Sequence, residues 1–224
     1  MKMLYTVDIQ RCFYDPERGT LYVRNAEKRL PNIFKLNERF RTSRQLEVGS
    51  ADAHLETSPE FTINGGPFNF HCIYGTDDAQ RPAVMDFYRK RKEIGYWEKI
   101  NDVEDYFKDD IGDNGKVNTY TYIFLKDALD VSTNANFEPV IKYLINVNTI
   151  TEVYIVGFAT DYCIKCAAEA FIGIQKKYNL PLSLYIVIDA IEGIDKKASD
   201  ACLKQLTSSG IKLITTQEVL TRLT

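Results

Sequence analysis

Cys163 is the residue whose type and setting best suit a nucleophile. It follows the apolar run at residues 153–156 and Gly157, and it falls in the first turn of a predicted helix. A thiol with a pKa near about 8.5 is mostly protonated at neutral pH. The positive end of a helix and its free backbone N–H groups stabilise a thiolate, and they can also hold an oxyanion. The segment therefore predicts acyl transfer by a cysteine.

Cys166 stands three residues after Cys163 and raises a redox or zinc alternative. A single C-x-x-C without a second pair is weak evidence for zinc, and thioredoxin-like motifs occur in a different setting. We interpret Cys166 as a packing residue, together with Cys12, Cys72 and Cys202. Five cysteines are an odd number with no framework spacing, which favours a reducing, cytoplasmic location.

A thiol nucleophile needs a base, and the chain has only two histidines, both far from Cys163 in sequence. Asp8 and Lys126 each end a predicted strand. Parallel strands can bring these ends into one crevice beside Cys163. We predict that Asp8 takes the thiol proton and that Lys126 holds both anions by charge and hydrogen bonds.

A second group of residues has the chemistry of a metal site. Asp52 and His54 are two positions apart, so on an extended segment both point to the same side. His71 would complete three ligands, and Glu60 is close enough to be a fourth or outer one. Carboxylate oxygens with imidazole nitrogens suit a divalent ion. The alternative is a hydrogen-bonded Asp52–His54 pair and a core histidine at position 71.

The elements that must position these residues alternate along the chain. Apolar runs that suit strands covered on both faces lie at residues 3–7, 119–125, 153–156, 184–188 and 211–215. Amphipathic segments at residues 138–146, 161–178 and 195–209 predict helices, with Asp161 and Asp195 as N-caps and Gly210 as a left-handed C-terminal residue. Residues 26–42 predict a helix that Pro31 delays. This pattern predicts a doubly wound α/β domain with a mainly parallel central sheet flanked by helices.

Composition narrows the class of protein. The chain has 224 residues with 28 basic and 31 acidic side chains and a net charge of −3. Nucleic-acid binders usually carry a basic patch, so we expect no nucleic acid partner. No run approaches the roughly 18 apolar residues of a membrane span, and the N-terminus does not read as a secretory signal. Without a repeat or linker, residues 1–224 predict one domain. The mixed charges between Met85 and Lys116 predict a solvated surface excursion.

The order of these motifs resembles the isochorismatase-like cysteine hydrolases, and within them the nicotinamidases. VDIQRCF resembles the opening motif, which places Asp8 on the base and Phe13 on a substrate-packing aromatic. IFLKDALDVSTNANF resembles the lysine motif with Lys126. VGFATDYCIKCAAEAF resembles G-x-A-T-D-x-C-V, with Cys163 as the nucleophile. The resemblance implies a cis peptide before Ala159 and an oxyanion hole from the N–H groups of Ala159 and Cys163.

The same resemblance extends to the metal motifs. SADAH is similar to D-W-H, with Asp52 and His54 as ligands, and PFNFHCIYGT is similar to W-P-x-H-C-x-x-G-T, with His71 as the third. Phe68 falls on the position of the substrate-stacking tryptophan, and Ala53 replaces the tryptophan between the ligands. The resemblance implies one divalent ion, zinc first and iron or manganese otherwise, that orients a pyridine nitrogen.

The function implied by the resemblance is hydrolysis of nicotinamide or a close small carboxamide through a Cys163 thioester, in pyridine nucleotide salvage. The changes at Ala53 and Phe68 keep open a second interpretation, a cysteine hydrolase of another small amide or carbamate. A third is a non-catalytic relative that binds a ligand on the same scaffold. A small-molecule amide is the expected partner, with no membrane, and the sequence leaves homo-oligomerisation open.

Overall fold

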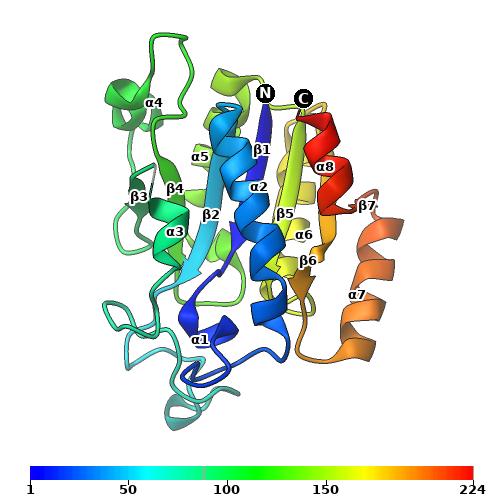
Figure 1. Ribbon diagram of the computed structural model, residues 1–224. Coiled ribbons are helices and arrows are strands. Elements are labelled where there is room, and N and C mark those ends of the chain that lie inside the picture. The colour runs from blue at the N-terminus through cyan, green and yellow to red at the C-terminus, as the bar shows by residue number, and fades with distance from the viewer. Residues whose placement is uncertain (88, 224) are drawn as a thin grey trace.

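The computed structural model describes residues 1–87 and 89–223. Across these residues a seven-stranded sheet runs in the order β3-β4-β2-β1-β5-β6-β7, with every neighbouring pair parallel (Figure 1). The predicted α/β domain with a parallel sheet is confirmed. The strands are β1 (Lys2–Val7), β2 (Leu46–Asp52), β3 (Arg91–Ile94), β4 (Thr121–Lys126), β5 (Glu152–Phe158), β6 (Ser183–Glu192) and β7 (Lys212–Ile214).

Helices cover both faces of the sheet. They are α1 (Arg11–Tyr14), α2 (Leu30–Thr42), α3 (Ala83–Asp86), α4 (Val103–Phe107), α5 (Phe137–Asn148), α6 (Cys163–Lys177), α7 (Lys196–Ser208) and α8 (Thr216–Arg222). Single 3-10 turns occur at η1 (Ala26–Lys28), η2 (Thr62–Asn64), η3 (Lys108–Asp110) and η4 (Val131–Thr133). In Figure 1, α2 and α8 lie in front of the sheet, and α5 and α6 lie behind it.

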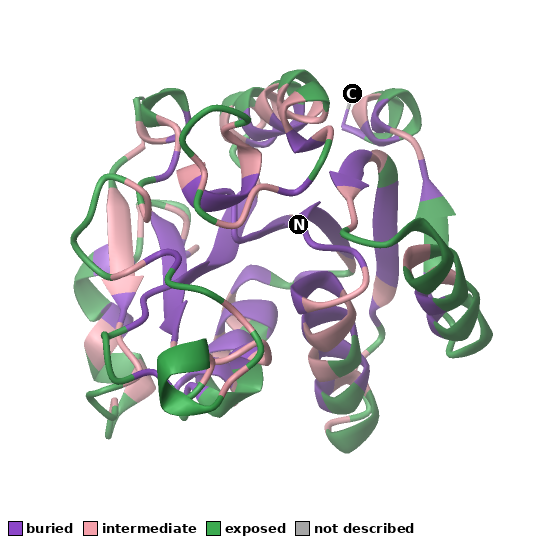
Figure 2. Cartoon of the chain, turned by 90° about the horizontal axis from the view of Figure 1, so that it is seen from below, coloured by how far each residue is buried: buried purple, intermediate pink, exposed green. Residues whose placement is uncertain are grey.

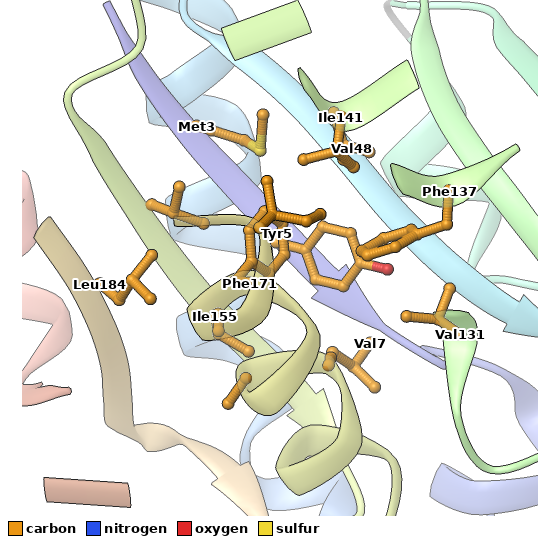
Figure 3. Close-up of a cluster of buried hydrophobic side chains, with 14 of the residues drawn as sticks. Met3, Tyr5, Val7, Val48, Val131, Phe137, Ile141, Ile155, Phe171 and Leu184 are labelled. Atoms are coloured by element: carbon orange, nitrogen blue, oxygen red, sulfur yellow. The ribbon is translucent and has the colours of Figure 1, made fainter. Parts of the chain in front are cut away.

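Strand β1 shows how the two faces are filled. Successive side chains of a strand point to opposite faces. Met3, Tyr5 and Val7 therefore join the core under α5 and α6, whereas Leu4 joins the core under α2. Tyr5 lies edge-on to Phe137 and Phe171, with ring centroids 6.1 and 4.9 Å apart (Figure 3). Figure 2 shows that buried positions concentrate on the central strands and on the sheet-facing sides of the helices.

The helix ends agree with the sequence at several positions and differ at one. Pro31 lies in the first turn of α2, Asp195 caps α7 by accepting from Ala198 N–H at 2.8 Å, and Gly210 has a φ of +101°. Asp161 does not cap α6, because that helix begins later, at Cys163. Its carboxylate instead accepts the N–H groups of Ile194 and Asp195, at 3.0 and 2.9 Å. Asp161 therefore ties the loop before α6 to the loop before α7.

Strand β2 was not predicted from the sequence, because LEVGSAD lacks an apolar run. Every residue of β2 is buried, including Glu47, which accepts a 2.5 Å hydrogen bond from Asn37 of α2. Gly49 is required by packing, since a Cβ there would clash with Thr6 of β1. Neighbouring elements thus satisfy the polar residues of β2, and this long-range information is absent from the local pattern.

The charged stretch from Met85 to Lys116 contains β3, α4 and η3, and its Tyr88 lies outside the described residues. It is more than a solvated face. Tyr96 donates a 3.1 Å hydrogen bond to the carbonyl of Ala53, and Trp97 packs on Tyr74 with ring centroids 5.3 Å apart. The stretch therefore supports the loops that follow β2. Within residues 1–87 and 89–223, no helix has the length and apolarity that a membrane crossing needs.

Candidate active site

Four neighbouring strands, in the order β4-β2-β1-β5, deliver the predicted residues to one edge of the sheet. Lys126 ends β4 and pairs in register with Asp52, which ends β2. Asp8 follows β1 directly, and β5 leads through a short loop to Cys163, the first residue of α6. Ligands of open α/β sheets bind at this carboxyl edge. The structure thus brings Asp8, Lys126 and Cys163 into one crevice, the arrangement expected from the sequence, and adds Asp52, which was expected only in the metal group.

Lys126 lies at the centre of this group and is 1% exposed. Its ammonium is 3.0 Å from Asp8 Oδ2 and 3.6 Å from Cys163 Sγ, and it also donates a short hydrogen bond to Asp52 Oδ1. Burial lowers the pKa of Lys126, but the carboxylates of Asp52 and Asp8 outweigh burial and raise that pKa well above its usual value. Lys126 is therefore a fixed cation between two carboxylates and a thiol.

Asp8 is fully buried and oriented from two sides. Ser50 Oγ donates a 2.7 Å hydrogen bond to Oδ1, while Oδ2 faces Lys126. Burial raises the pKa of Asp8, and Lys126 only partly opposes that effect. A carboxyl group with a raised pKa is a better proton acceptor than an ordinary one. Asp8 adopts a φ of +48°, uncommon for a residue with a Cβ, which turns the chain sharply at the end of β1.

Cys163 is 5% exposed, and burial raises the pKa of its thiol well above the usual value. A raised pKa favours the protonated thiol, so a nucleophile at this position would need a base. Asp8 is the candidate base, because an oxygen of its carboxylate, the sulfur of Cys163 and an oxygen of Asp52 lie within 4.8 Å of one another. Within the described residues, the backbone N–H groups of Ala159 and Cys163 donate to no protein acceptor. The Phe158–Ala159 peptide is cis, as the resemblance predicted.

Asp52, His54 and His71 place one oxygen and two imidazole nitrogens within 4.8 Å of one another. All three side chains are buried, and His54 Nε2 has no hydrogen-bond partner in the described structure. A buried nitrogen without a partner is costly unless it binds something. The Lys126 ammonium, despite burial, keeps the pKa of Asp52 well below its usual value, so this oxygen is ionised. These residues fit a divalent metal ion.

Glu60 lies beside this group rather than in it. Its Oε2 is 3.9 Å from His54 Nε2, and burial raises its pKa. The structure therefore leaves Glu60 close enough for the outer role that the sequence suggested.

Three contacts in the site were not predicted. The side-chain amide of Gln10 makes two hydrogen bonds to the backbone of Asp52. Its Nε2 donates to the Asp52 carbonyl at 2.8 Å, and its Oε1 accepts from the Asp52 N–H at 2.7 Å. Ser50 orients Asp8, and Asp127 contacts His54 Nδ1 at 2.7 Å. Each of these three residues lies one or two positions from a predicted site residue. Closeness in sequence was therefore the only local signal that could have identified them.

Aromatic rings gather around His71. Phe13 and Phe68, the predicted substrate-contacting residues, have ring centroids 5.9 and 5.7 Å from that of His71. Tyr162, which precedes Cys163, lies edge-on to Phe68 at 5.9 Å. Phe61 is buried against both histidines. The rings of Phe68 and Tyr162 thus connect the metal-binding side of the site with the nucleophile side.

The cysteines differ from the sequence-based interpretation. Cys12 of α1 and Cys72, which follows His71, are fully buried in the core under α2, as expected of packing residues, but they also form a disulfide across 60 residues of sequence that was not predicted. Asp78 reinforces this junction, since its carbonyl accepts from Cys12 N–H and its carboxylate from Cys72 N–H. Cys166 and Cys202 are free thiols, and Cys202 donates to the carbonyl of Thr160.

Comparison with known proteins begins with sequence. No protein-family model matches the chain. A nicotinamidase from Acinetobacter baylyi is 27% identical over 232 residues, which cover 97% of this chain and 94% of the relative. The similarity therefore spans both chains almost completely.

Solved structures agree with this similarity. An isochorismatase-like hydrolase from Alkaliphilus metalliredigens has a TM-score of 0.67 at 15% identity, covering 100% of both chains. The chain has the isochorismatase-like hydrolase fold. A pyrazinamidase from Pyrococcus horikoshii in complex with zinc has a TM-score of 0.67 at 22% identity, over 96% of this chain and 98% of that one. An N-carbamoylsarcosine amidase from Thermoplasma acidophilum has a TM-score of 0.62 at 20% identity, over 96% and 97%.

Proposed function

We propose that this protein is a cysteine amidohydrolase that converts nicotinamide, or a close small carboxamide, to the acid and ammonia. One observation carries the proposal. A single buried ammonium, that of Lys126, contacts the candidate base Asp8, the candidate nucleophile Cys163 and the candidate metal ligand Asp52. This arrangement joins a thiol reaction centre to a metal-binding group within one cluster. The whole-length similarity to a nicotinamidase supports the choice of substrate class.

The first half of the reaction forms a thioester. Asp8 accepts the thiol proton of Cys163, and the sulfur bonds to the carboxamide carbon. The N–H groups of Ala159 and Cys163, which have no acceptor in the described protein, hold the oxyanion. Asp8 then returns its proton to the amide nitrogen as the C–N bond breaks, and ammonia leaves.

The second half releases the acid. Asp8 takes a proton from water, and the water oxygen bonds to the thioester carbon. The C–S bond then breaks to release the acid, and Asp8 returns the proton to the departing sulfur, which restores the Cys163 thiol and the ionised Asp8. Lys126 keeps its positive charge throughout and stabilises the anionic forms of Asp8 and Cys163. The buried setting of all three side chains strengthens these interactions.

Asp52, His54 and His71 would hold the divalent ion, with Glu60 as an outer group; zinc is the first candidate, and iron and manganese are the others. When bound, such an ion supplies a Lewis-acid contact that orients a ring nitrogen of the substrate. Phe13 and Phe68 lie against His71 and would pack on the ring of the substrate. The proposed selectivity is therefore for a small aromatic amide.

A second candidate function is hydrolysis of another small amide or carbamate. It is favoured by Ala53 and Phe68, which stand where the nicotinamidase motifs have tryptophan, and by the structural similarity to an N-carbamoylsarcosine amidase. The non-catalytic alternative is opposed by the close contact of Lys126 with Asp8 and Cys163, which a ligand-binding scaffold does not need.

The test is ammonia release from nicotinamide, pyrazinamide, N-carbamoylsarcosine and an aliphatic amide, paired with metal analysis of the purified protein. The proposal expects nicotinamide or pyrazinamide to have the highest kcat/KM, with about one divalent ion bound per chain. The highest kcat/KM for N-carbamoylsarcosine would select the second candidate. No ammonia from any of the four amides, with the metal loaded, would contradict both.

Cytoplasmic location and a role in pyridine nucleotide salvage belong to the same proposal. The disulfide between Cys12 and Cys72 is an observation against that location, because disulfides are rare in a reducing cytosol. Cell fractionation with thiol trapping before lysis decides the matter. The proposal expects the protein in the cytoplasmic fraction, and recovery from an oxidising compartment would contradict it.

A further inference from the structure

His54 is held by a carboxylate on the side away from the candidate metal position. Its Nδ1 lies 2.7 Å from Oδ1 of Asp127, while its Nε2 has no hydrogen-bond partner and lies 3.7 Å from Asp52 Oδ2. The imidazole is 0% exposed, so the surrounding protein encloses it. The orientation of this ring is therefore determined by the protein alone.

The partner of each Nδ1 atom determines which ring nitrogen carries the proton. The oxygens of a carboxylate group are hydrogen-bond acceptors, so the 2.7 Å contact with Asp127 Oδ1 favours His54 with its proton on Nδ1. The lone pair is then on Nε2, which faces Asp52. His71 reaches the same state by another route, since its Nδ1 lies 2.8 Å from the carbonyl oxygen of Asn69. Both imidazoles thus present an unprotonated Nε2 to Asp52.

The two contacts should strengthen metal binding by His54 and His71 to different degrees. A carbonyl only fixes the tautomer, whereas a carboxylate also adds negative charge and makes the ring a stronger electron donor. Asp127 is part of neither the catalytic group nor the metal-ligand group, yet it follows Lys126 directly in sequence. Consecutive residues at the end of β4 therefore contact the nucleophile centre and the metal centre.

We propose that Asp127 is a positioning residue that holds His54 in the Nδ1–H tautomer and thereby raises the affinity of the site for a divalent metal ion. This inference rests on the metal site in the proposed function. Ser58 Oγ lies 3.2 Å from the same Nδ1 and is a weaker substitute acceptor, so removing Asp127 loosens the ring without leaving Nδ1 wholly unpaired. The expected loss of metal affinity is about 10- to 100-fold, the usual effect of removing such an outer carboxylate.

The first experiment uses metal-free protein and does not depend on activity. Because the chain has only two histidines, ¹⁵N-labelled histidine gives only two imidazole spin systems. At a pH where both rings are neutral, the wild type should show both in the Nδ1–H tautomer. Asp127→Ala should shift His54 toward the Nε2–H tautomer and leave His71 unchanged as an internal control. An unchanged His54 tautomer in Asp127→Ala would overturn the inference.

The second experiment measures the dissociation constant for Zn²⁺ by competition with a chromophoric chelator. Asp127→Ala should weaken binding by about 10- to 100-fold, and Asp127→Asn, which keeps an acceptor oxygen without the charge, should fall between it and the wild type. Asp130→Asn is the matched control, since it removes the charge of a carboxylate three positions further along the chain that caps η4, and it should leave affinity within about 2-fold of the wild type.

The outcomes separate this inference from the proposed function. Wild-type affinity in both Asp127 variants would overturn the positioning role and leave the metal site intact. Wild-type protein that binds no Zn²⁺ would overturn the metal site and this inference with it, whatever amides the enzyme hydrolyses. Equal weakening in Asp127→Ala and Asp130→Asn would show a general charge effect and overturn the inference as well.

Discussion

The proposed nucleophile centre (Asp8, Lys126 and Cys163) and the proposed metal centre (Asp52, His54 and His71) both contain or contact Lys126, but they are built in different ways. Asp8, Lys126 and Cys163 each follow or end an element of the sheet, and parallel register brings them together. In the metal centre only Asp52 ends a strand. His54 and His71 lie on loops joined by an isolated bridge between His54 and Ile73, and the disulfide from Cys72 ties the His71 loop to Cys12 of α1. The sheet thus fixes the reaction centre, and cross-linked loops fix the ligands.

Replacing the nucleophile should separate the two centres most strongly. Cys163→Ala removes the bond-forming atom and should reduce kcat by roughly 10⁴-fold or more, because no other group replaces a covalent nucleophile. Bound metal, measured by elemental analysis, should stay at the wild-type level, since Cys163 is not one of the three proposed ligands, Asp52, His54 and His71. Retained activity would remove Cys163 from the mechanism, and lost metal would show that the centres are not separable.

Replacing a ligand should have the converse effect. Asp52→Ala should weaken Zn²⁺ binding by more than about 100-fold, which exceeds the usual effect of an outer-sphere change. It should also raise KM more than it lowers kcat, because the ion is expected to orient the substrate rather than to react. His71→Ala is the matched variant, since it removes a ligand without touching Lys126. A variant at Asp52 that keeps its metal would remove this residue from the ligand set.

Lys126 tests the connection between the centres. Lys126→Met leaves the buried carboxylates of Asp8 and Asp52 without their shared cation, and breaking a buried ion pair in this way costs about 3–5 kcal/mol. The free energy of unfolding in urea should fall by that amount. Lys196→Met, which breaks an exposed ion pair with Asp200, should change it by about 0.5 kcal/mol or less. Equal effects of the two variants would contradict the central position of Lys126.

The pH dependence of kcat/KM should report the pKa of Asp8, and it is the smallest of the four expected effects. The base must be ionised, and burial raises its pKa, so activity should disappear as pH falls through a value above the ordinary carboxyl pKa of about 3.9. Ser50→Ala removes a hydrogen bond that favours the ionised form, so its acid limb should move to higher pH. An acid limb at or below the ordinary value, or no movement in Ser50→Ala, would contradict the assignment of Asp8.

The same contrast explains what the sequence could predict. Asp8, Lys126 and Cys163 were identifiable because each adjoins an apolar run or a helix start, which are local patterns. Strand β2 was not identifiable. Its buried Glu47 is accommodated by a hydrogen bond from Asn37 of α2, and its Gly49 is required by the close approach of Thr6 in β1. The disulfide was missed because Cys12 and Cys72 meet only when the loop after β1 packs on the loop that carries His71.

Asp127 illustrates the remaining limit. In the sequence, Asp127 looks like an ordinary polar loop residue after Lys126. Its proposed role depends on a 2.7 Å contact with His54, which precedes it by 73 positions. Asp161 is the opposite case. Its position suggested a helix cap, but in the structure its carboxylate accepts hydrogen bonds from the loop before α7. Local patterns identified the residue types of the site, whereas their partners required the fold.

The most direct test of the account is to identify the group on Cys163 during turnover. The protein would be mixed with nicotinamide, quenched in acid within one turnover, digested and analysed by mass spectrometry. The account predicts a nicotinoyl group in thioester linkage on the peptide that contains Cys163, and its absence from Asp8→Asn protein treated in the same way. Rapid ammonia release with unmodified Cys163 at every quench time, or with the acyl group on another residue, would contradict it.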